Sequence, residues 1–562
     1  MKGVPATEFS ANSKVGKVGN MLTATQAWLK RTFIDIFRQM RWSFLPPLMV
    51  YFAAGISGLT AIVGTFFVKE YLGLSAAFLA ALTFWAGLPW ALKMPLGHLV
   101  DLIWRWKSLL VYLGAALIAA SLGIMYALIM HAEAMRQLLS AEAWFVLSSL
   151  LAPAGYVVQD TVADALSVEA VPRVGADGQP LSEEETKALH TTMQTLGRIA
   201  LIGGLAFVAV LNIVMFAGVE SLDQKLKADI YARIYLIAFV IPLVSVSGVV
   251  LSQFMLSARA RRLRKQGIEV AEVDRLIYSP GQRTEPNYWI FGGGAAFVVL
   301  TLAIGISDIP LSQEIVFCGS MAIITALIYQ LVQKLPPAKA RALIGTAIII
   351  FVFRAVPLPG AGATWFQIDR LGFDQQFLSV LSLISSCLTL LGMVLLRPLM
   401  ASRSMAFIVV VLTLASGVLS LPNIGLYYGV QDWTARLTGG VVDGRFIAII
   451  DTMLESPLGQ IAMIPLLTWI ARNAPADLKA TFFAVMASFA NMALTLSSLL
   501  TKYMNHIFVV TRELKDQATG TIQSPADYSQ LGWLLITVML IGVLAPLLTV
   551  FLVQRSRFQT QD

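Results

Sequence analysis

The sequence predicts an all-α polytopic membrane protein. Of its 562 residues, 57% are hydrophobic and only 13% are charged, and the mean hydropathy is +0.73. Soluble domains have about 45–50% apolar and about 25% charged residues. Apolar runs recur along the whole chain, and each is long enough to cross a bilayer as one helix. These observations exclude an ordinary soluble globular protein.

Counting apolar runs of about 20 residues predicts about 14 transmembrane helices. They lie near residues 43–68, 76–98, 108–130, 143–170, 189–216, 232–256, 288–306, 312–333, 342–358, 376–397, 404–420, 446–471, 480–501 and 531–553.

Three segments outside these spans complete the predicted domain organisation. Residues 1–42 begin as a polar tail, and Met21–Trp42 mixes apolar and basic side chains, which predicts an amphipathic helix in the membrane interface. The first span, after Arg41, is too long for the hydrophobic region of a signal peptide, so no cleavage is expected. A basic cytosolic loop is predicted over 257–287, and a cytosolic tail over 554–562.

The positive charges predict the orientation. With the N-terminus in the cytosol, the cytosolic segments hold 27 of the 41 Lys and Arg residues and the opposite loops hold 11. Short cytosolic loops are enriched in Lys and Arg. We therefore expect both termini in the cytosol and the protein in the cell inner membrane. The net charge of +8 belongs to these loops and does not indicate a nucleic-acid partner.

Several functional classes find no support in the residues. Cys318 and Cys387 lie inside apolar runs, which argues against a disulfide framework, and four scattered histidines form no metal site. No Gly-x-x-x-x-Gly-Lys-Ser/Thr motif is present, so an ATP-driven pump is not indicated. We expect neither enzymatic activity nor a cofactor.

An internal repeat predicts how the helices are grouped. At an offset of 299 residues, Phe, Leu, Gly, Phe and Leu coincide between 67–79 and 366–378. Each copy links the first two helices of a six-helix bundle, and parallel six-helix repeats are an architecture of transporters. The predicted bundles are 43–256 and 334–553, and an inserted two-helix hairpin occupies 288–333.

Three segments of the first bundle resemble the folate-biopterin transporter family of the major facilitator superfamily: Tyr51–Leu59, Lys69–Ser75 and Leu88–Asp101. Further matches lie at 160–169, 194–204, 371–373 and 475–484. The resemblance implies a major facilitator fold, and a secondary transporter that moves folate or a pterin by alternating access.

The sequence departs from the family pattern at three positions. Met94 separates Lys93 from Pro95, Val100 replaces a serine, and Lys479 replaces a glutamate. These departures leave the identity of the substrate open. Separately, the Gln159-Asp160 and Asp164-Ala165 pairs also resemble muropeptide permeases. The alternatives are a muropeptide or other organic-anion permease, or a non-transporting assembly factor of the same fold.

Two pairs of carboxylates lie inside apolar runs on repeat-related helices. Asp160 and Asp164 are one helical turn apart, and so are Asp451 and Glu455. An Asp near mid-membrane costs about 3 kcal/mol, so it faces protein or a water-filled cavity. A buried carboxyl beside another carboxylate binds a proton readily. The four acids are candidates for proton coupling, with Asp160 and Asp451 as the leading choices; the alternative places them at helix ends facing water.

Arg354 and Arg198 are the cations expected inside spans to bind a carboxylate. Each could pair with a buried acid, or grip a substrate carboxylate bidentately. Gln159 and Trp90 are further substrate-binding candidates, the latter by stacking on a ring or, alternatively, as a lipid-facing anchor.

The family resemblance implies a cytosolic gate at the end of the second helix. Lys93, Gly97, Asp101 and Arg105 follow the superfamily pattern of Gly-x-x-x-Asp with nearby basic residues. Gly97 is expected to permit close helix approach. The partners expected overall are a small anionic solute, protons and membrane lipid, with the protein as a monomer.

Overall fold

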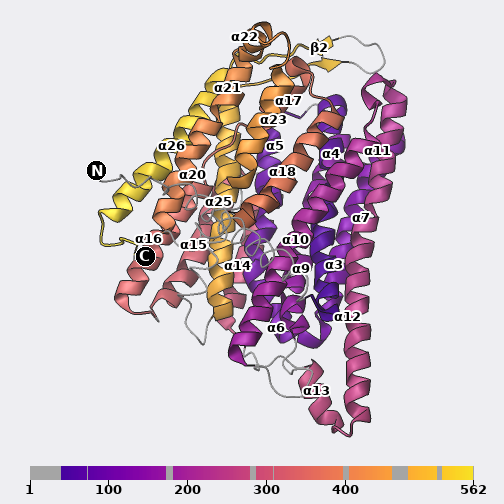
Figure 1. Ribbon diagram of the computed structural model, residues 1–562, viewed down its shortest axis with the longest axis vertical. Helices are drawn as coiled ribbons and strands as arrows, with labels where there is room; N and C mark the ends of the chain where they lie inside the picture. The colour runs from indigo at the N-terminus through magenta and orange to yellow at the C-terminus, as the bar shows by residue number, and fades with distance from the viewer. Residues whose placement is uncertain are drawn as a thin grey trace, which may run out of the picture.

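The computed structural model describes residues 40–72, 74–171, 182–278, 286–307, 309–333, 335–395, 404–458, 479–515 and 522–560. Long helices lie side by side along the longest axis of the molecule (Figure 1). The described departure from an all-α fold is a short antiparallel pair at the upper end of the view, formed by β1 (Leu514–Lys515) and β2 (Ile522–Ser524). The predicted all-α membrane fold is confirmed, and the sequence did not predict this strand pair.

The first half of the chain contains two interrupted helices. The first combines α3, η3 and α4, and the second combines α5, η4 and α6. Pro89 lies in η4, and because proline has no N–H, the α-helical ladder of hydrogen bonds cannot continue through it. The helices of this half are α3 (Leu45–Ile56), α4 (Ala61–Tyr71), α5 (Ala76–Gly87), α6 (Lys93–Leu102), α7 (Ser108–Met130), α8 (Ala132–Leu138), α9 (Ala141–Ala170), α10 (Glu183–Met215), α11 (Gln224–Ala238) and α12 (Val240–Lys265), with 3-10 turns η2 (Trp42–Phe44), η3 (Ser57–Thr60), η4 (Leu88–Leu92), η5 (Trp104–Trp106) and η6 (Val219–Ser221).

The rest of the chain is also helical. It contains α13 (Val270–Tyr278), α14 (Tyr288–Ile306), α15 (Ser312–Val332), α16 (Pro337–Arg354), α17 (Ala361–Leu371), α18 (Gln375–Leu395), α20 (Met405–Leu419), α21 (Leu421–Tyr427), α22 (Val430–Leu437), α23 (Gly444–Glu455), η7 (Ser456–Leu458), α25 (Lys479–Ile507) and α26 (Leu531–Gln554).

Within the described residues, eleven stretches are long and apolar enough to cross a membrane, against about 14 predicted. The predicted spans 342–358, 446–471 and 480–501 are not among the eleven; α16, α23 and α25 lie at these places. The second half of the span 446–471 lies outside the described residues, as do most of the predicted amphipathic helix and residues 475–478 of the family motif.

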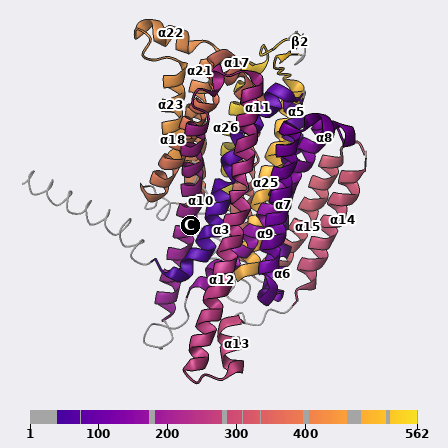
Figure 2. The same cartoon turned by 90° about the vertical axis from the view of Figure 1, so that its right-hand side faces the viewer.

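The first half of the molecule, from α3 to α12, and the second half, from α16 to α26, meet along two pairs of helices. The α10 helix packs against α18, and α5 packs against α25. The hairpin of α14 and α15 lies at one edge of the molecule (Figure 2), where α14 contacts α6 and α15 contacts α25. This hairpin therefore touches both halves. We name the two ends of the molecule by the helices that lie there: the α17 end is at the top of Figure 1 and the α13 end at the bottom.

The predicted basic loop over 257–287 is partly helical. The α12 helix continues to Lys265, and α13 then folds back along it. Val273 packs on Ala260, and Arg264 forms an ion pair of 3.3 Å with Asp274. Few apolar side chains pack within this helical hairpin, and many arginines lie between them. A search for apolar runs therefore does not detect its helices.

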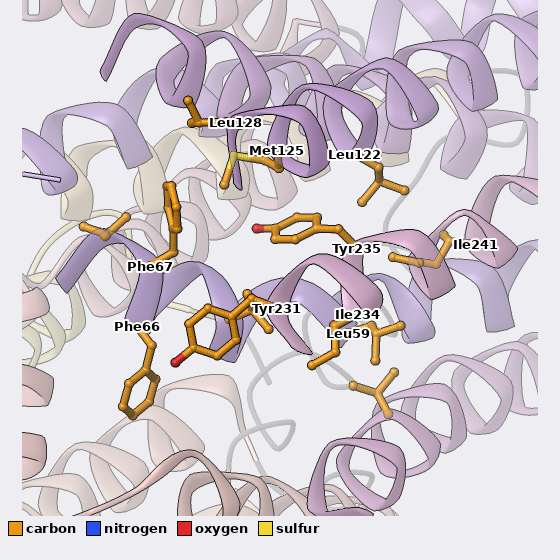
Figure 3. Packing of buried hydrophobic residues seen from close by; sticks show 14 of the residues in the cluster. Leu59, Phe66, Phe67, Leu122, Met125, Leu128, Tyr231, Ile234, Tyr235 and Ile241 are labelled. Atoms are coloured by element: carbon orange, nitrogen blue, oxygen red, sulfur yellow. The ribbon is translucent and has the colours of Figure 1, made fainter. Parts of the chain in front are cut away.

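A large apolar cluster forms the core of the first half near the α17 end. Tyr231 and Tyr235 of α11 lie among Phe66, Phe67 and Met125, which come from α4 and α7 (Figure 3). Tyr231 is fully buried, and its hydroxyl accepts a hydrogen bond of 2.9 Å from Gln375 Nε2 of α18. This buried polar contact joins the two halves.

Candidate functional site

The first candidate acid pair lies on α9, which is held unusually close to α7. A Cβ atom added to Gly155 would lie 2.6 Å from the carbonyl oxygen of Gly114, and the reverse contact is equally short. Only glycine permits this approach. One turn farther along α9, Gln159 is buried and its Nε2 donates to the carbonyl oxygen of Val111 (3.2 Å). The Gln159 amide thus binds the backbone of α7.

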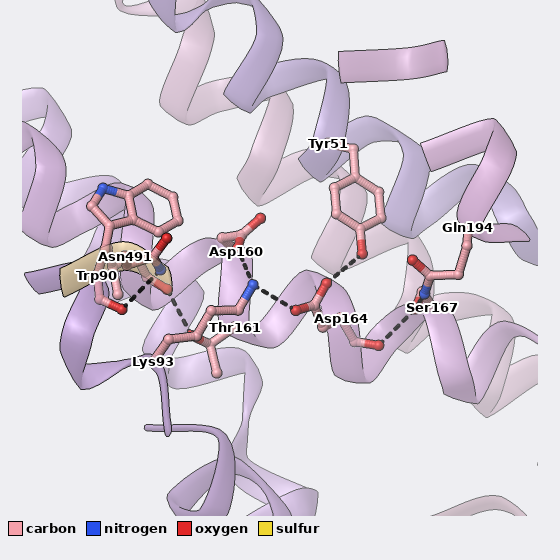
Figure 4. Close-up of polar contacts among 10 residues, drawn as sticks. Tyr51, Trp90, Lys93, Asp160, Thr161, Asp164, Ser167, Gln194 and Asn491 are labelled. Atoms are coloured by element: carbon pink, nitrogen blue, oxygen red, sulfur yellow. Dashed lines mark hydrogen bonds and ion pairs between the residues drawn. The ribbon is translucent and has the colours of Figure 1, made fainter. Parts of the chain in front are cut away.

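Lys93 lies between the two carboxylates of α9. Its Nζ is 2.5 Å from Asp160 Oδ2 and 2.8 Å from Asp164 Oδ2 (Figure 4). We expected Lys93 in a cytosolic gate with Asp101, but the structure places its ammonium group between the proton-coupling candidates. The physical reason is the interruption at η4: Lys93 is the first residue of α6, and α6 packs against α9.

Two other helices contribute to this lysine–carboxylate cluster. The hydroxyl of Tyr51 on α3 donates to Asp164 Oδ1 at 2.7 Å. The hydroxyl of Ser167 donates to the carbonyl oxygen of Asp164 and accepts from Gln194 Nε2 on α10. Residues of α3, α6, α9 and α10 therefore converge on one site (Figure 4). Sequence reasoning missed Tyr51 as a carboxylate partner and Gln194 as part of this network.

The cluster lies near a contact between the two halves. Asn491 Nδ2 on α25 donates to the carbonyl oxygen of Trp90 at 3.3 Å (Figure 4). Trp90 is half-buried, and its carbonyl oxygen contacts the second half. A change in the position of Lys93, three residues later, is therefore linked to the packing between the halves.

The two arginine candidates lie apart from these ion pairs. Asp160 and Asp164 pair with Lys93, whereas the exposed Arg198 acts on Asp160 by longer-range electrostatic attraction. Arg354 is the last residue of α16 and is half-buried. Lys93 on the neighbouring helix forms the ion pairs with both α9 carboxylates, and the binding roles of Arg198 and Arg354 stay predictions.

The second acid pair has different surroundings. Asp451 on α23 is 6% exposed, and its Oδ2 accepts from Asn423 Nδ2 of α21 at 2.7 Å. Its Oδ1 has no hydrogen-bond partner among the described residues. Glu455, one turn later, is exposed. In the part of the chain that the structure describes, neither acid forms an ion pair.

The remaining gate candidates lie toward the α13 end. Asp101 is half-buried near the end of α6, and Arg105 is exposed in η5. A Cβ atom added to Gly97 would lie 3.9 Å from Thr161 Cγ2, an ordinary contact, so close helix approach does not require glycine there. Nearby, Lys107 is buried and forms an ion pair of 3.0 Å with Glu169. Burial lowers the pKa of Lys107, which its negative neighbour partly offsets.

The two repeat segments meet at the α17 end. Lys69 Nζ of α4 lies 2.5 Å from Asp369 Oδ1 of α17, and both side chains are largely buried. The Tyr528 hydroxyl donates to Asp369 Oδ2 at 2.5 Å. Sequence reasoning missed this pair as a contact, although the repeat alignment contains both residues. An ion pair therefore joins the two halves at this end.

Comparisons with known proteins agree with this architecture. The pattern that defines the BT1 family matches residues 54–562. A folate-biopterin transporter of Synechocystis sp. is 24% identical over 476 residues, which cover 84% of this chain and 76% of the relative.

Solved transporter structures share the fold at lower identity. A POT family transporter in complex with 5-aminolevulinic acid is 14% identical, covers 92% of this chain and 96% of its own, and has a TM-score of 0.55. The nucleoside transporter NupG is 11% identical, covers 90% of this chain and 98% of its own, and has a TM-score of 0.52. Because the family pattern spans nearly the whole chain, the protein belongs to the BT1 family and is a membrane transporter rather than an enzyme.

Proposed function

We propose that the protein is a proton-coupled secondary transporter that moves a small organic anion by alternating access. The carrying observation is the position of Lys93, whose single ammonium group lies within 2.8 Å of both α9 carboxylates. The name of the Synechocystis relative supports a folate-like or pterin-like solute. Folate-like and pterin-like conjugates can both carry carboxylates, which an ammonium group binds strongly.

Competition for Lys93 provides the coupling. When both acids are ionised, Asp160 and Asp164 hold the ammonium group and compete with any solute carboxylate. When Asp164 takes up a proton, one of these attractions is removed and Lys93 can bind the solute. Asp164 is the acid that a proton from solvent reaches more easily, because its side chain is 45% exposed, against 16% for Asp160.

Proton binding and anion binding therefore support each other. By thermodynamic linkage, a proton that raises the affinity for the anion is itself bound more tightly when the anion is present. One proton and one monovalent carboxylate carry no net charge together, which lowers the cost of moving the occupied site through the membrane. Trp90 and Arg198 are the further solute contacts that we propose.

Transport into proteoliposomes tests the proposal. Radiolabelled folate, pterin and muropeptide are offered with and without an imposed proton gradient, and exchange is measured separately with equal solute on both sides. We expect gradient-driven accumulation of a folate-like solute by the unmodified protein. Asp164→Asn mimics the protonated acid, so it should keep exchange but lose accumulation. Lys93→Gln should lose both.

Matched substitutions far from the cluster provide the controls. Lys225 and Asp432 are exposed, and Lys225→Gln and Asp432→Asn should transport as the unmodified protein does. Movement of muropeptide alone would favour the permease alternative. If none of the solutes moves, or if Lys93→Gln transports normally, the proposal is wrong.

We also propose that the protein lies in the cell inner membrane with both termini in the cytosol. The distribution of Lys and Arg along the chain supports this orientation. Reporter domains fused to the C-terminus, active only in the cytosol or only outside it, test the orientation. Activity of the outside reporter would contradict it.

A further inference from the structure

Arg512, between α25 and β1, is buried without a full set of hydrogen-bond partners. Its side chain is 3% exposed, and its Nη1 donates to the carbonyl oxygen of Leu74 at 3.0 Å. Its guanidinium group lies over the ring of Trp365, 4.7 Å from the centroid. Among the described residues, nothing accepts a hydrogen bond from Nε or Nη2. These two nitrogens form the edge that binds a carboxylate bidentately, so the unoccupied edge requires an explanation.

The carboxylate of Asp369 lies on the same helix as Trp365. Trp365 and Asp369 are four residues apart on α17 and therefore share one face of the helix. Thr511 and Asp527 pair through two backbone hydrogen bonds, of 3.0 and 2.9 Å, and the next residue along each segment is Arg512 and Tyr528. Asp369, Tyr528 and Arg512 thus all belong to the second half of the molecule.

The electrostatics couple these groups without a direct contact. Burial lowers the pKa of Arg512 to about 10, and the negative charge of Asp369 opposes this shift. Arg512 therefore remains a cation near neutral pH. In this structure, one carboxylate oxygen of Asp369 pairs with Lys69, and the other accepts a hydrogen bond from Tyr528.

Asp369 and Arg512 each make a contact that joins the halves at this end, and alternating access must break both. Lys69 belongs to the first half, as does Leu74, whose carbonyl oxygen accepts from Arg512. When the halves separate, Asp369 loses its cation and Arg512 loses its described acceptor. Both charged groups remain in the second half, where an unpaired buried charge is costly.

We propose that, when the α17 end opens, Asp369 exchanges its ion-pair partner Lys69 for Arg512. The unoccupied Nε–Nη2 edge then binds the carboxylate that Lys69 releases, and the ion pair between the halves is replaced by one within the second half. Lys69 stabilises the closed α17 end and Arg512 stabilises the open one. This inference rests on the alternating access of the proposed function, and it assigns Arg512 a positioning role in that cycle.

A simpler role for Arg512 makes the opposite prediction. If Arg512 only holds the α17 end closed through Leu74, its loss should favour the open state, as loss of Lys69 should. If Arg512 receives Asp369, its loss should disfavour the open state. The sign of the change in the open population therefore distinguishes the two roles.

Distances between spin labels on the full-length protein measure this population. Cys318 and Cys387 are replaced by serine, and labels are attached after Glu133→Cys on α8 and Arg436→Cys on α22, which are exposed at the α17 end of different halves (Figure 2). We expect Lys69→Gln to raise the fraction of long distances. In that background, Arg512→Gln should lower the open-to-closed ratio about fivefold, the size of one partly exposed ion pair.

A second variant and a control keep the measurement decisive. Arg512→Lys keeps the charge but cannot bind with two parallel N–H groups, so it should lower the ratio less, by about twofold. It replaces Arg512→Gln if that variant does not fold. Arg557→Gln, at an exposed arginine near the C-terminus, should leave the ratio unchanged.

Two outcomes would overturn the inference. A higher open fraction with Arg512→Gln or Arg512→Lys would make Arg512 a second closing contact. If Lys69→Gln shows no long distances, Lys69 does not hold this end closed. Opening would then release no carboxylate for Arg512 to bind. The uptake experiment on Lys93 decides the proposed function separately, so the two failures are distinguishable.

Discussion

The two acid pairs have the same spacing but opposite electrostatic surroundings. On α9, Lys93 contacts both Asp160 and Asp164. On α23, Asp451 is more deeply buried but is held by the amide of Asn423, and no described cation pairs with it. A buried carboxylate without a cation is costly, so the neutral acid is the form that fits the α23 site.

This difference assigns different tasks to the two halves. The α9 pair shares one cation, so the charge on either acid changes the strength with which Lys93 is held. The α23 pair has no described cation to release, so its protonation cannot free a binding group in the same way. We therefore assign the coupling of proton and anion to the half that contains Lys93.

Loss of the lysine is expected to have the largest effect on this comparison. Lys93→Gln leaves two carboxylates facing each other without their cation, which should lower the free energy of unfolding by about 3 kcal/mol. Thermal and denaturant unfolding in detergent measures the change. Adding Asp160→Asn should recover part of the loss, because one uncompensated charge is removed. If Lys93→Gln is no less stable than Lys225→Gln, the ion pairs contribute nothing to the fold.

The close approach of α7 and α9 provides a second test. Gly155→Ala places a methyl group 2.6 Å from the Gly114 carbonyl oxygen and 2.8 Å from Ile118 Cγ1, so α9 must move. Overpacking of this kind costs about 2 kcal/mol, and the displaced carboxylates should also reduce uptake. Gly203→Ala on α10 is the control, since nothing lies within 4 Å of the added atom. Equal stability of the two variants would show that α7 does not position the acid pair.

The sequence predicted the elements of the α9 site better than their partners. Spacing of four residues placed Asp160 and Asp164 on one face, and both carboxylates contact the same lysine. The identity of that lysine depends on the interruption around Pro89, which turns Lys93 toward α9. Apolar periodicity reports which residues are buried, but it contains no information about contacts between helices.

The contacts at the α17 end were harder to predict for a related reason. Lys69 and Asp369 are separated by 300 positions, and only the packing of the two halves brings them together. Arg512 lies in a polar segment between apolar runs, where an arginine is normally solvated. Its burial results from Trp365 and the short Thr511–Asp527 bridge, which no local pattern in the sequence indicates.

Asp451→Asn should have the smallest effect and tests the comparison most directly. If Asp451 is already neutral, an amide of the same shape changes the free energy of unfolding by less than about 1 kcal/mol, and the carbonyl oxygen can still accept from Asn423. Gradient-driven accumulation should remain above half of its normal rate, in contrast to its loss in Asp164→Asn. Both quantities come from the unfolding and uptake measurements described above. If Asp451→Asn instead keeps normal solute exchange but loses accumulation, Asp451 is the acid that binds the proton. Proton coupling would then belong to the second half.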